Sequence, residues 1–295
     1  AMDPHGLAHA LRKAAEDRRF PVGASQPVRD LAGEFAHSKN HIRKVGELTE
    51  AGFQSFRRIR GDGNCFYRAV GFAWLEALAA LASSGRAPPR GALGAWPEES
   101  MFGPLATEYR DLRSAVARLT DDRGRAAEIG AQLLSRLLGD PKLDLCVVVL
   151  VRRLVASFFQ ASETGGDDES LRVAIMVQHG SEEQFLSREV LPLGQEAEGA
   201  AIAIAARQLG VRMVIRQLDG SPGPPPVYTY PSEDYSSPLG VTVHLLFRPG
   251  HYEILYAAGS PRLRDPALLG ARCSFCQQLV SLPSEGLMPC FHRLC

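Results

Sequence analysis

Several features are scarce in this sequence of 295 residues, and each scarcity excludes a class of protein. Charge of one sign is not in excess, because 33 Lys and Arg residues balance 33 Asp and Glu residues. A net charge of zero argues against a nucleic-acid-binding protein that relies on a general basic field. No stretch reaches the roughly 20 apolar residues of a membrane-spanning helix, and the first residues lack the pattern of a signal peptide. We therefore expect neither a nucleic-acid partner nor a membrane.

Cysteine is also scarce outside the C-terminal tail. Only Cys65 and Cys146 precede residue 273, and all the other cysteines lie between residues 273 and 295. This distribution differs from that of a secreted fold held by disulfides, so we expect a reducing compartment, cytoplasmic or nuclear. Cys146 lies in an apolar run and is interpreted as a core residue, which leaves Cys65 as the thiol available for chemistry.

Hydrophobic periodicity predicts helices first and paired strands late, hence an α+β domain. Helices are expected over residues 7–19, 27–50, 65–81, 104–119, 125–138, 143–161, 182–190 and 199–210. Strands are expected over residues 211–216, 241–248 and 251–256, the last two as a hairpin. Residues 83–100 and 221–238 are rich in proline and are expected to be loops. Arg57, Arg58 and Arg60 are expected to form a solvated surface, with a functional patch as the alternative.

The segment Asp62-Gly63-Asn64-Cys65 precedes the strongest predicted helix. A thiol is nucleophilic as the thiolate, and a helix N-terminus lowers its pKa because unpaired N–H groups favour negative charge there. The same N–H groups can stabilise an oxyanion, and Gly63 lets a substrate backbone approach closely. The alternative is structural: Asp62 caps the helix and Cys65 is a small core residue.

A second candidate segment begins at His251, on the last predicted strand. Residues two apart on a strand share a face, so His251 and Glu253 are expected side by side. A Cys–His protease needs a third group that holds the imidazole, and this spacing can supply it. In the alternative interpretation, His251 lies at the edge of a turn and Glu253 is a surface carboxylate.

The two segments together resemble the nucleophile and histidine motifs of otubains, within the ovarian-tumour (OTU) family of deubiquitinases. The resemblance covers about residues 25–258 and rests on the following segments: Gly61–Ala69, Gly71-Phe72, Leu75-Glu76, Val147–Phe159, Glu189–Pro192, Arg248–Tyr252 and Ile254–Tyr256. It implies a papain-like α+β fold, with a mostly helical lobe packed on a small mixed β-sheet. It also implies hydrolysis of the isopeptide bond at the C-terminal glycine of ubiquitin, without a catalytic cofactor.

The resemblance also implies roles for individual residues. Cys65 would attack the carbonyl and His251 would take its proton. Asp62 and the backbone N–H groups through Gly63 and Asn64 would shape the oxyanion site. One position departs from the family, which usually has Asp or Asn two residues after the histidine, where this chain has Glu253. Whether this longer side chain orients the imidazole is left open by the sequence.

The tail carries a different pattern. A CxxC pair precedes a C-x-H-x-x-C segment, and the candidate zinc ligands are Cys273, Cys276, Cys290, His292 and Cys295. The order is similar to the first ligands of a RING finger, so a structural zinc is a possible cofactor. A RING needs two metals and more ligands than this tail supplies, so the resemblance is partial.

These observations divide the chain into three expected parts. Residues 1–24 would be a helical arm after a tag remnant at Ala1, residues 25–258 an otubain-like protease domain, and residues 271–295 a partial zinc-binding segment. The predicted partners are ubiquitin and polyubiquitin chains, with ubiquitin-conjugating enzymes as further candidates. Tyr228, Tyr230 and Tyr235 of the proline-rich loop are candidates for touching ubiquitin. The alternatives are a catalytically weak binding module and a RING-type ligase, and the sequence gives no linkage preference.

Overall fold

A computed structural model describes residues 4–17, 19–86, 96–160, 167–232 and 234–260. Its α-helices are α1 Pro4–Glu16, α2 Lys39–Glu50, α3 Cys65–Ser83, α4 Ala106–Asp121, α5 Ala126–Gly139, α6 Pro141–Ser157, α7 Asp167–His179, α8 Glu182–Phe185 and α9 Gly199–Gln208. Short 3-10 turns and one π turn join them: η1 Val28–Phe35, η2 Glu99–Leu105, η3 Arg123–Arg125, η4 Phe158–Gln160 and η5 Leu186–Val190. The strands are β1 Val22–Pro27, β2 Phe53–Ile59, β3 Arg212–Gln217, β4 Val227–Tyr230, β5 Thr242–Arg248 and β6 His251–Ala257.

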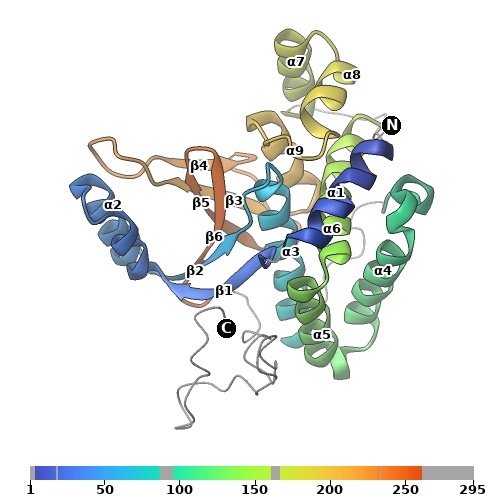
Figure 1. Ribbon diagram of the computed structural model, residues 1–295, viewed down its shortest axis with the longest axis horizontal. Helices are drawn as coiled ribbons and strands as arrows, with labels where there is room; N and C mark the ends of the chain where they lie inside the picture. The colour runs from blue at the N-terminus through green and yellow to red at the C-terminus, as the bar shows by residue number, and fades with distance from the viewer. Residues whose placement is uncertain (1–3, 18, 87–95, 161–166, 233, 261–295) are drawn as a thin grey trace.

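The strands form one mixed sheet in the order β1-β2-β6-β5-β3-β4. Only the β3–β5 pair is parallel among these described strands, and β5 and β6 make a hairpin in which Arg248 pairs with His251. Helix α3 lies between this sheet and the helices α5 and α6 (Figure 1). The predicted α+β class, with a helical lobe on a mixed sheet, is confirmed.

Helix α3 lies at the centre of the molecule, because most of its residues are apolar and nearly all of them are buried. It is the one described helix whose length and composition would suit a membrane, yet 94% of that window is buried inside the protein, as expected of a core helix. Its Gly71 permits a close crossing with α6: an added Cβ would lie 2.5 Å from Cγ1 of Val147 and 3.1 Å from Cγ2 of Val151. Cys65, the first residue of α3, lies next to the β5–β6 hairpin.

Several elements differ from the sequence prediction. The helix expected over residues 27–50 is preceded by strand β1 and begins as the turn η1, so α2 covers only its second half. The proline-rich loop contains the edge strand β4, and residues 167–179 form helix α7, for which no helix was predicted. The N-terminal part of the chain therefore also contributes strands to the sheet, because β1 pairs with β2 and β2 pairs with β6.

The expected arginine surface is wrong for two of its three members. Arg57 is 1% exposed and Arg60 is 7% exposed, while Arg58 is half-buried. The Arg57 Nε donates to the Tyr256 hydroxyl at 3.1 Å, and that hydroxyl donates to the Glu76 carboxylate at 2.7 Å. Both buried arginines have acidic neighbours that offset their charge: Glu76 beside Arg57, and Asp62 and Asp144 beside Arg60.

Candidate active site

The turn before α3 is held by an acidic side chain. Asp62 Oδ1 accepts the N–H of Asn64 at 3.0 Å, and both Asp62 oxygens accept from Arg68 at 2.8 Å. Burial would raise the pKa of Asp62, but the hydrogen bonds and charge of Arg68 hold it below its usual value. Asn64 is the residue at the helix N-cap, and no side chain caps that end. Asp62 thus shapes the turn, and the simple helix cap considered from the sequence does not describe it.

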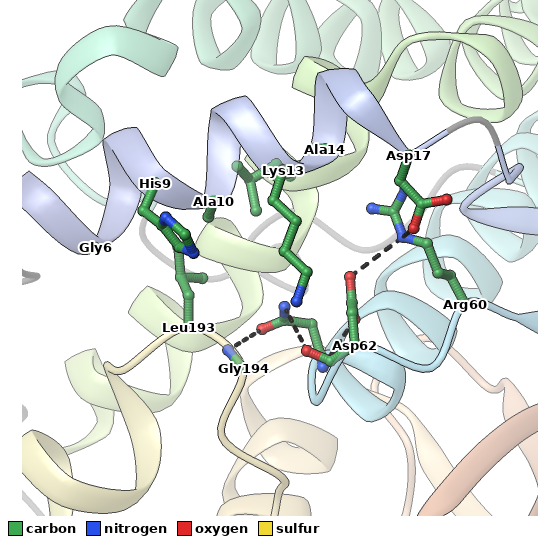
Figure 2. A pocket seen from close by; sticks show the side chains of 12 residues that line it. Gly6, His9, Ala10, Lys13, Ala14, Asp17, Arg60, Asp62, Leu193 and Gly194 are labelled. Atoms are coloured by element: carbon green, nitrogen blue, oxygen red, sulfur yellow. Dashed lines mark hydrogen bonds and ion pairs between the residues drawn. The ribbon is translucent and has the colours of Figure 1, made fainter.

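Asn64 connects this turn to a segment 130 residues further along the chain. Its Oδ1 accepts the backbone N–H of Gly194 at 2.9 Å, a contact drawn as a dashed line in Figure 2. The same oxygen accepts Nη2 of Arg152 at 2.8 Å. The sequence had singled out neither Arg152 nor Gly194, because no local pattern marks a contact over such a separation.

Gly63 has a positive φ of 75°, which favours glycine. A Cβ at this position would lie 1.9 Å from the carbonyl oxygen of Gly194. The sequence predicted that Gly63 leaves room for a substrate backbone. In this structure the space is filled by the protein's own backbone, so the glycine allows the turn and the segment around Gly194 to pack together.

The thiol of Cys65 meets the start of β6. The backbone N–H of Tyr252, the residue after His251, donates to the thiol, so the fold brings the two motifs together. Burial raises the pKa of Cys65, although the N–H groups of Tyr252 and Phe66 favour the thiolate. Burial therefore opposes the lowering of the thiol pKa that was expected from the helix N-terminus.

His251 lies where β6 begins, across the strand pair from Arg248. Burial lowers the pKa of His251 and the cation of Arg248 lowers it further, while a hydrogen bond with the backbone of Ile59 opposes both effects. Its ring also packs against the turn, since a Cβ added to Gly61 would lie 3.6 Å from Nδ1. The imidazole is thus neutral near pH 7, as a general base must be.

Glu253 lies beside His251, as the strand spacing predicted. However, its Oε1 is 4.0 Å from Nε2 of the imidazole, which is beyond hydrogen-bond distance. The same oxygen accepts Nη2 of Arg248 at 2.5 Å and lies 3.5 Å from Nη1 of Arg58. The carboxylate is fully buried, and it is held by arginines in the place where the family usually has a shorter side chain. Its proposed role as the orienting group stays a prediction.

Two cavities flank the turn and the strand hairpin. One, of about 270 Å³, lies between α1 and the nucleophile turn and is lined by Lys13, Asp62 and Asn64 among others (Figure 2). The other, of about 340 Å³, adjoins Tyr252 and is lined in part by Tyr228 and Tyr230 of β4. The second cavity places two of the tyrosines from the proline-rich loop next to the hairpin that carries His251.

The candidate zinc ligands of the tail lie outside the described residues, so that hypothesis stays a prediction. Within the part of the chain that is described, no group of three or more His, Cys, Asp or Glu side chains is arranged to hold a metal ion. The described cysteines, Cys65 and Cys146, are both free and buried.

A thiol at the start of a central helix, with a histidine on the facing strand hairpin, defines an α+β cysteine peptidase of the papain-like kind. The family model for Peptidase C65 Otubain matches residues 13–94 and 99–257. The chain therefore belongs to the otubain family, as its motifs predicted, and is a thiol peptidase that requires no catalytic cofactor.

Several characterised proteins are similar to this chain. Ubiquitin thioesterase OTUB1 of Homo sapiens is 29% identical over 231 residues, which cover 77% of this chain and 79% of that protein. The ovarian-tumour-domain-containing deubiquitinating enzyme 1 of Arabidopsis thaliana is 26% identical over 274 residues, covering 83% of each. In a solved complex with ubiquitin aldehyde and UBCH5B~Ub, the h/ceOTUB1 chain is 22% identical, with a TM-score of 0.56 over 85% of this chain and 96% of that one.

Proposed function

We propose that this otubain is an active deubiquitinase that cleaves isopeptide bonds at the C-terminal glycine of ubiquitin, with Cys65 as nucleophile and His251 as general base. The observation that carries the proposal is the contact of the Cys65 thiol with the backbone N–H of Tyr252, next to His251. Ubiquitin as substrate is supported by the relatives, which are ubiquitin thioesterases.

The pKa directions support a neutral thiol and a neutral imidazole at rest, because burial raises the pKa of Cys65 and lowers that of His251. As Cys65 Sγ attacks the glycine carbonyl, its proton passes to the imidazole. The tetrahedral oxyanion is stabilised by N–H groups of the turn ending at Cys65. Collapse breaks the C–N bond, the leaving amine takes the proton from His251, and water then hydrolyses the thioester.

The solved complexes support a proposal of partners beyond ubiquitin. Structures similar to this fold contain ubiquitin aldehyde together with UBCH5B~Ub or UBC13~Ub. We propose that this chain also binds ubiquitin-conjugating enzymes, and that it works in a reducing compartment where the free thiols Cys65 and Cys146 persist.

The second candidate function is a binding module with weak catalysis. The observation that favours it is the 4.0 Å separation between Glu253 and the imidazole, with the carboxylate held by Arg248 instead. In that case the chain would bind ubiquitin without efficient turnover.

The deciding experiment uses ubiquitin with a thiol-reactive C-terminal group. The unsubstituted protein and Cys146→Ala should form a covalent adduct, whereas Cys65→Ala should form none. His251→Ala should label more slowly by about 100-fold or more, within the range typical for loss of a general base. Absence of an adduct with the folded, unsubstituted protein would refute the active enzyme and favour the binding module, which a measured affinity for ubiquitin would then test.

A further inference from the structure

Arg152 of α6 is a buried cation without an acidic partner among the described residues. It is 0% exposed, and no carboxylate oxygen of those residues lies within 4.0 Å of its guanidinium. Burial lowers the pKa of Arg152 to about 10, so the side chain is still charged near pH 7. A buried charge persists only where dipoles or rings replace water. The groups that contact the guanidinium in place of water therefore show which segments Arg152 connects.

The guanidinium makes three hydrogen bonds that join two segments. Nη1 donates to the carbonyl of Val190 at 2.6 Å, and Nη2 donates to the carbonyl of Gln195 at 2.8 Å and to Asn64 Oδ1 at 2.8 Å. Its Cζ lies 3.8 Å from the ring centre of Tyr67, in the first turn of α3. One side chain therefore ties residues 190–195 to the nucleophile turn and to the helix that follows it.

A second link between the same segments runs beside the first. The Gly194 N–H donates to the oxygen of Asn64 that Arg152 also binds (Figure 2). The Gly194 carbonyl fills the space beside Gly63, so a displaced segment would disturb the turn directly. Because Asn64 is the residue before Cys65, a change at Arg152 reaches the N–H groups that would face the oxyanion.

We propose that Arg152 is a positioning residue for the oxyanion turn, acting through Asn64 and the segment 190–195. The inference rests on the proposed function and adds to it a residue that touches no substrate. The requirement is geometric: the planar fork of arginine reaches three acceptors, whereas lysine keeps the charge but is a single point donor. A displacement of about 1 Å at such a site can cost up to about 100-fold in rate.

The test compares Arg152→Lys with Arg153→Lys on the same helix. Arg153 is half-buried and donates to the carbonyl of Met101 at 3.2 Å, away from the turn. With ubiquitin carrying a fluorogenic C-terminal amide, Arg152→Lys should lower kcat about tenfold or more, while KM changes less than about threefold. Arg153→Lys should leave both unchanged. An unchanged kcat in Arg152→Lys, or an equal loss in Arg153→Lys, would overturn the proposal.

Two further readouts separate positioning from other causes. Alkylation of Cys65 by iodoacetamide forms no oxyanion, so its rate should stay within about twofold in Arg152→Lys; a parallel loss would assign the effect to the thiol instead. Asn64→Ala should add little to Arg152→Lys, because both act through one contact, and additive losses would contradict this.

A readout without catalysis keeps the two proposals distinguishable. The backbone N–H of Gly194 donates to Asn64 Oδ1. Its hydrogen exchange should be at least about tenfold faster in Arg152→Lys than in the unsubstituted protein. If the unsubstituted protein fails to react with ubiquitin, the proposed function fails, and unchanged Gly194 exchange would separately refute positioning by Arg152.

Discussion

At the residue scale, the electrostatics around His251 set the pH at which it can act as a base. Four charged side chains face it: the cations Arg248 and Arg58 lower its pKa, Asp62 raises it, and Glu253 lies 4.0 Å away. Burial is the largest effect and also lowers the pKa. A base with a lowered pKa stays unprotonated to more acidic pH, so activity is lost only as the pH falls through that lowered value.

We therefore expect the acid limb of kcat/KM to lie below about pH 6.5, the ordinary value for histidine. In Arg248→Gln one cation beside His251 is removed, so its pKa rises and the acid limb should move to higher pH. Arg110→Gln, which removes a surface cation paired with Glu99, is the control and should leave the profile unchanged. A profile that is identical in Arg248→Gln and the unsubstituted protein would show that His251 does not determine the acid limb.

Glu253 is expected to matter more for stability than for rate. Its carboxylate accepts Arg248 at 2.5 Å but is too far from His251 for a hydrogen bond. Glu253→Gln should lower the free energy of unfolding by about 1–3 kcal/mol, because Arg248 and Arg58 lose the buried negative charge that offsets theirs. It should lower kcat/KM less than about tenfold, since the imidazole keeps its contact with the backbone of Ile59. A rate loss as large as that of His251→Ala, without loss of stability, would instead make Glu253 the orienting group.

The sequence predicted the residues of the site better than their surroundings. Cys65 and His251 lie in long local motifs, and the hairpin between β5 and β6 was predicted from Pro249-Gly250. Arg152 could not be found in this way, because its acceptors come from segments far apart in the chain. The burial of Arg57 was missed for the same reason: whether a charged side chain is buried depends on which strands flank its own.

At the element scale, the crossing of α3 and α6 determines where the nucleophile lies. Gly71→Ala adds a methyl group 2.5 Å from Cγ1 of Val147, too close for a real contact. We expect a loss of about 1–3 kcal/mol in the free energy of unfolding, as for other overpacked cores, despite the better helix propensity of alanine. Urea denaturation of Gly71→Ala and the unsubstituted protein measures this difference in the free energy of unfolding.

Gly46→Ala on α2 is the matched control for this substitution. Nothing lies within 4 Å of the Cβ that it would add. Alanine there should stabilise the protein by about 0.5–1 kcal/mol through helix propensity alone. Equal effects of Gly46→Ala and Gly71→Ala would mean that the helix crossing adjusts without cost.

The two edge strands that the sequence missed, β1 and β4, share a physical cause. Strand β1 contains glycine and proline, which suit an edge position and carry little strand propensity. Strand β4 is short and lies at the other edge of the sheet, inside a proline-rich connection. The central helices were predicted because burial on several sides leaves a strong apolar pattern in the sequence, whereas edge strands are specified mainly by the neighbour with which they pair.

At the scale of the whole molecule, ion pairs join segments that are distant in sequence. Lys44 of α2 binds Asp219 at 2.5 Å, and Arg248 of β5 binds Glu34 of η1 at 3.0 Å. Hydrogen bonds from Lys44 hold the pKa of Asp219 well below its usual range. Such carboxylates contribute stability above their unfolded pKa of about 4, and this contribution is lost as pH falls through the lower folded value.

Acid destabilisation should nevertheless begin above that range, because of a partly buried histidine, His244. Burial lowers the pKa of His244 to about 4, and the cation of Arg216 acts in the same direction. In the unfolded chain this residue is protonated below about pH 6.5, whereas in the folded protein it is protonated only below about pH 4. The free energy of unfolding therefore falls as pH decreases between these two values. The urea midpoint should therefore decline from pH 7 to pH 4.5, and His244→Gln should make that decline shallower. His9→Gln, at an exposed position of α1, is the control and should leave the slope unchanged. An unaltered slope in His244→Gln would place the acid sensitivity of the fold elsewhere, with His251 as the next group to substitute.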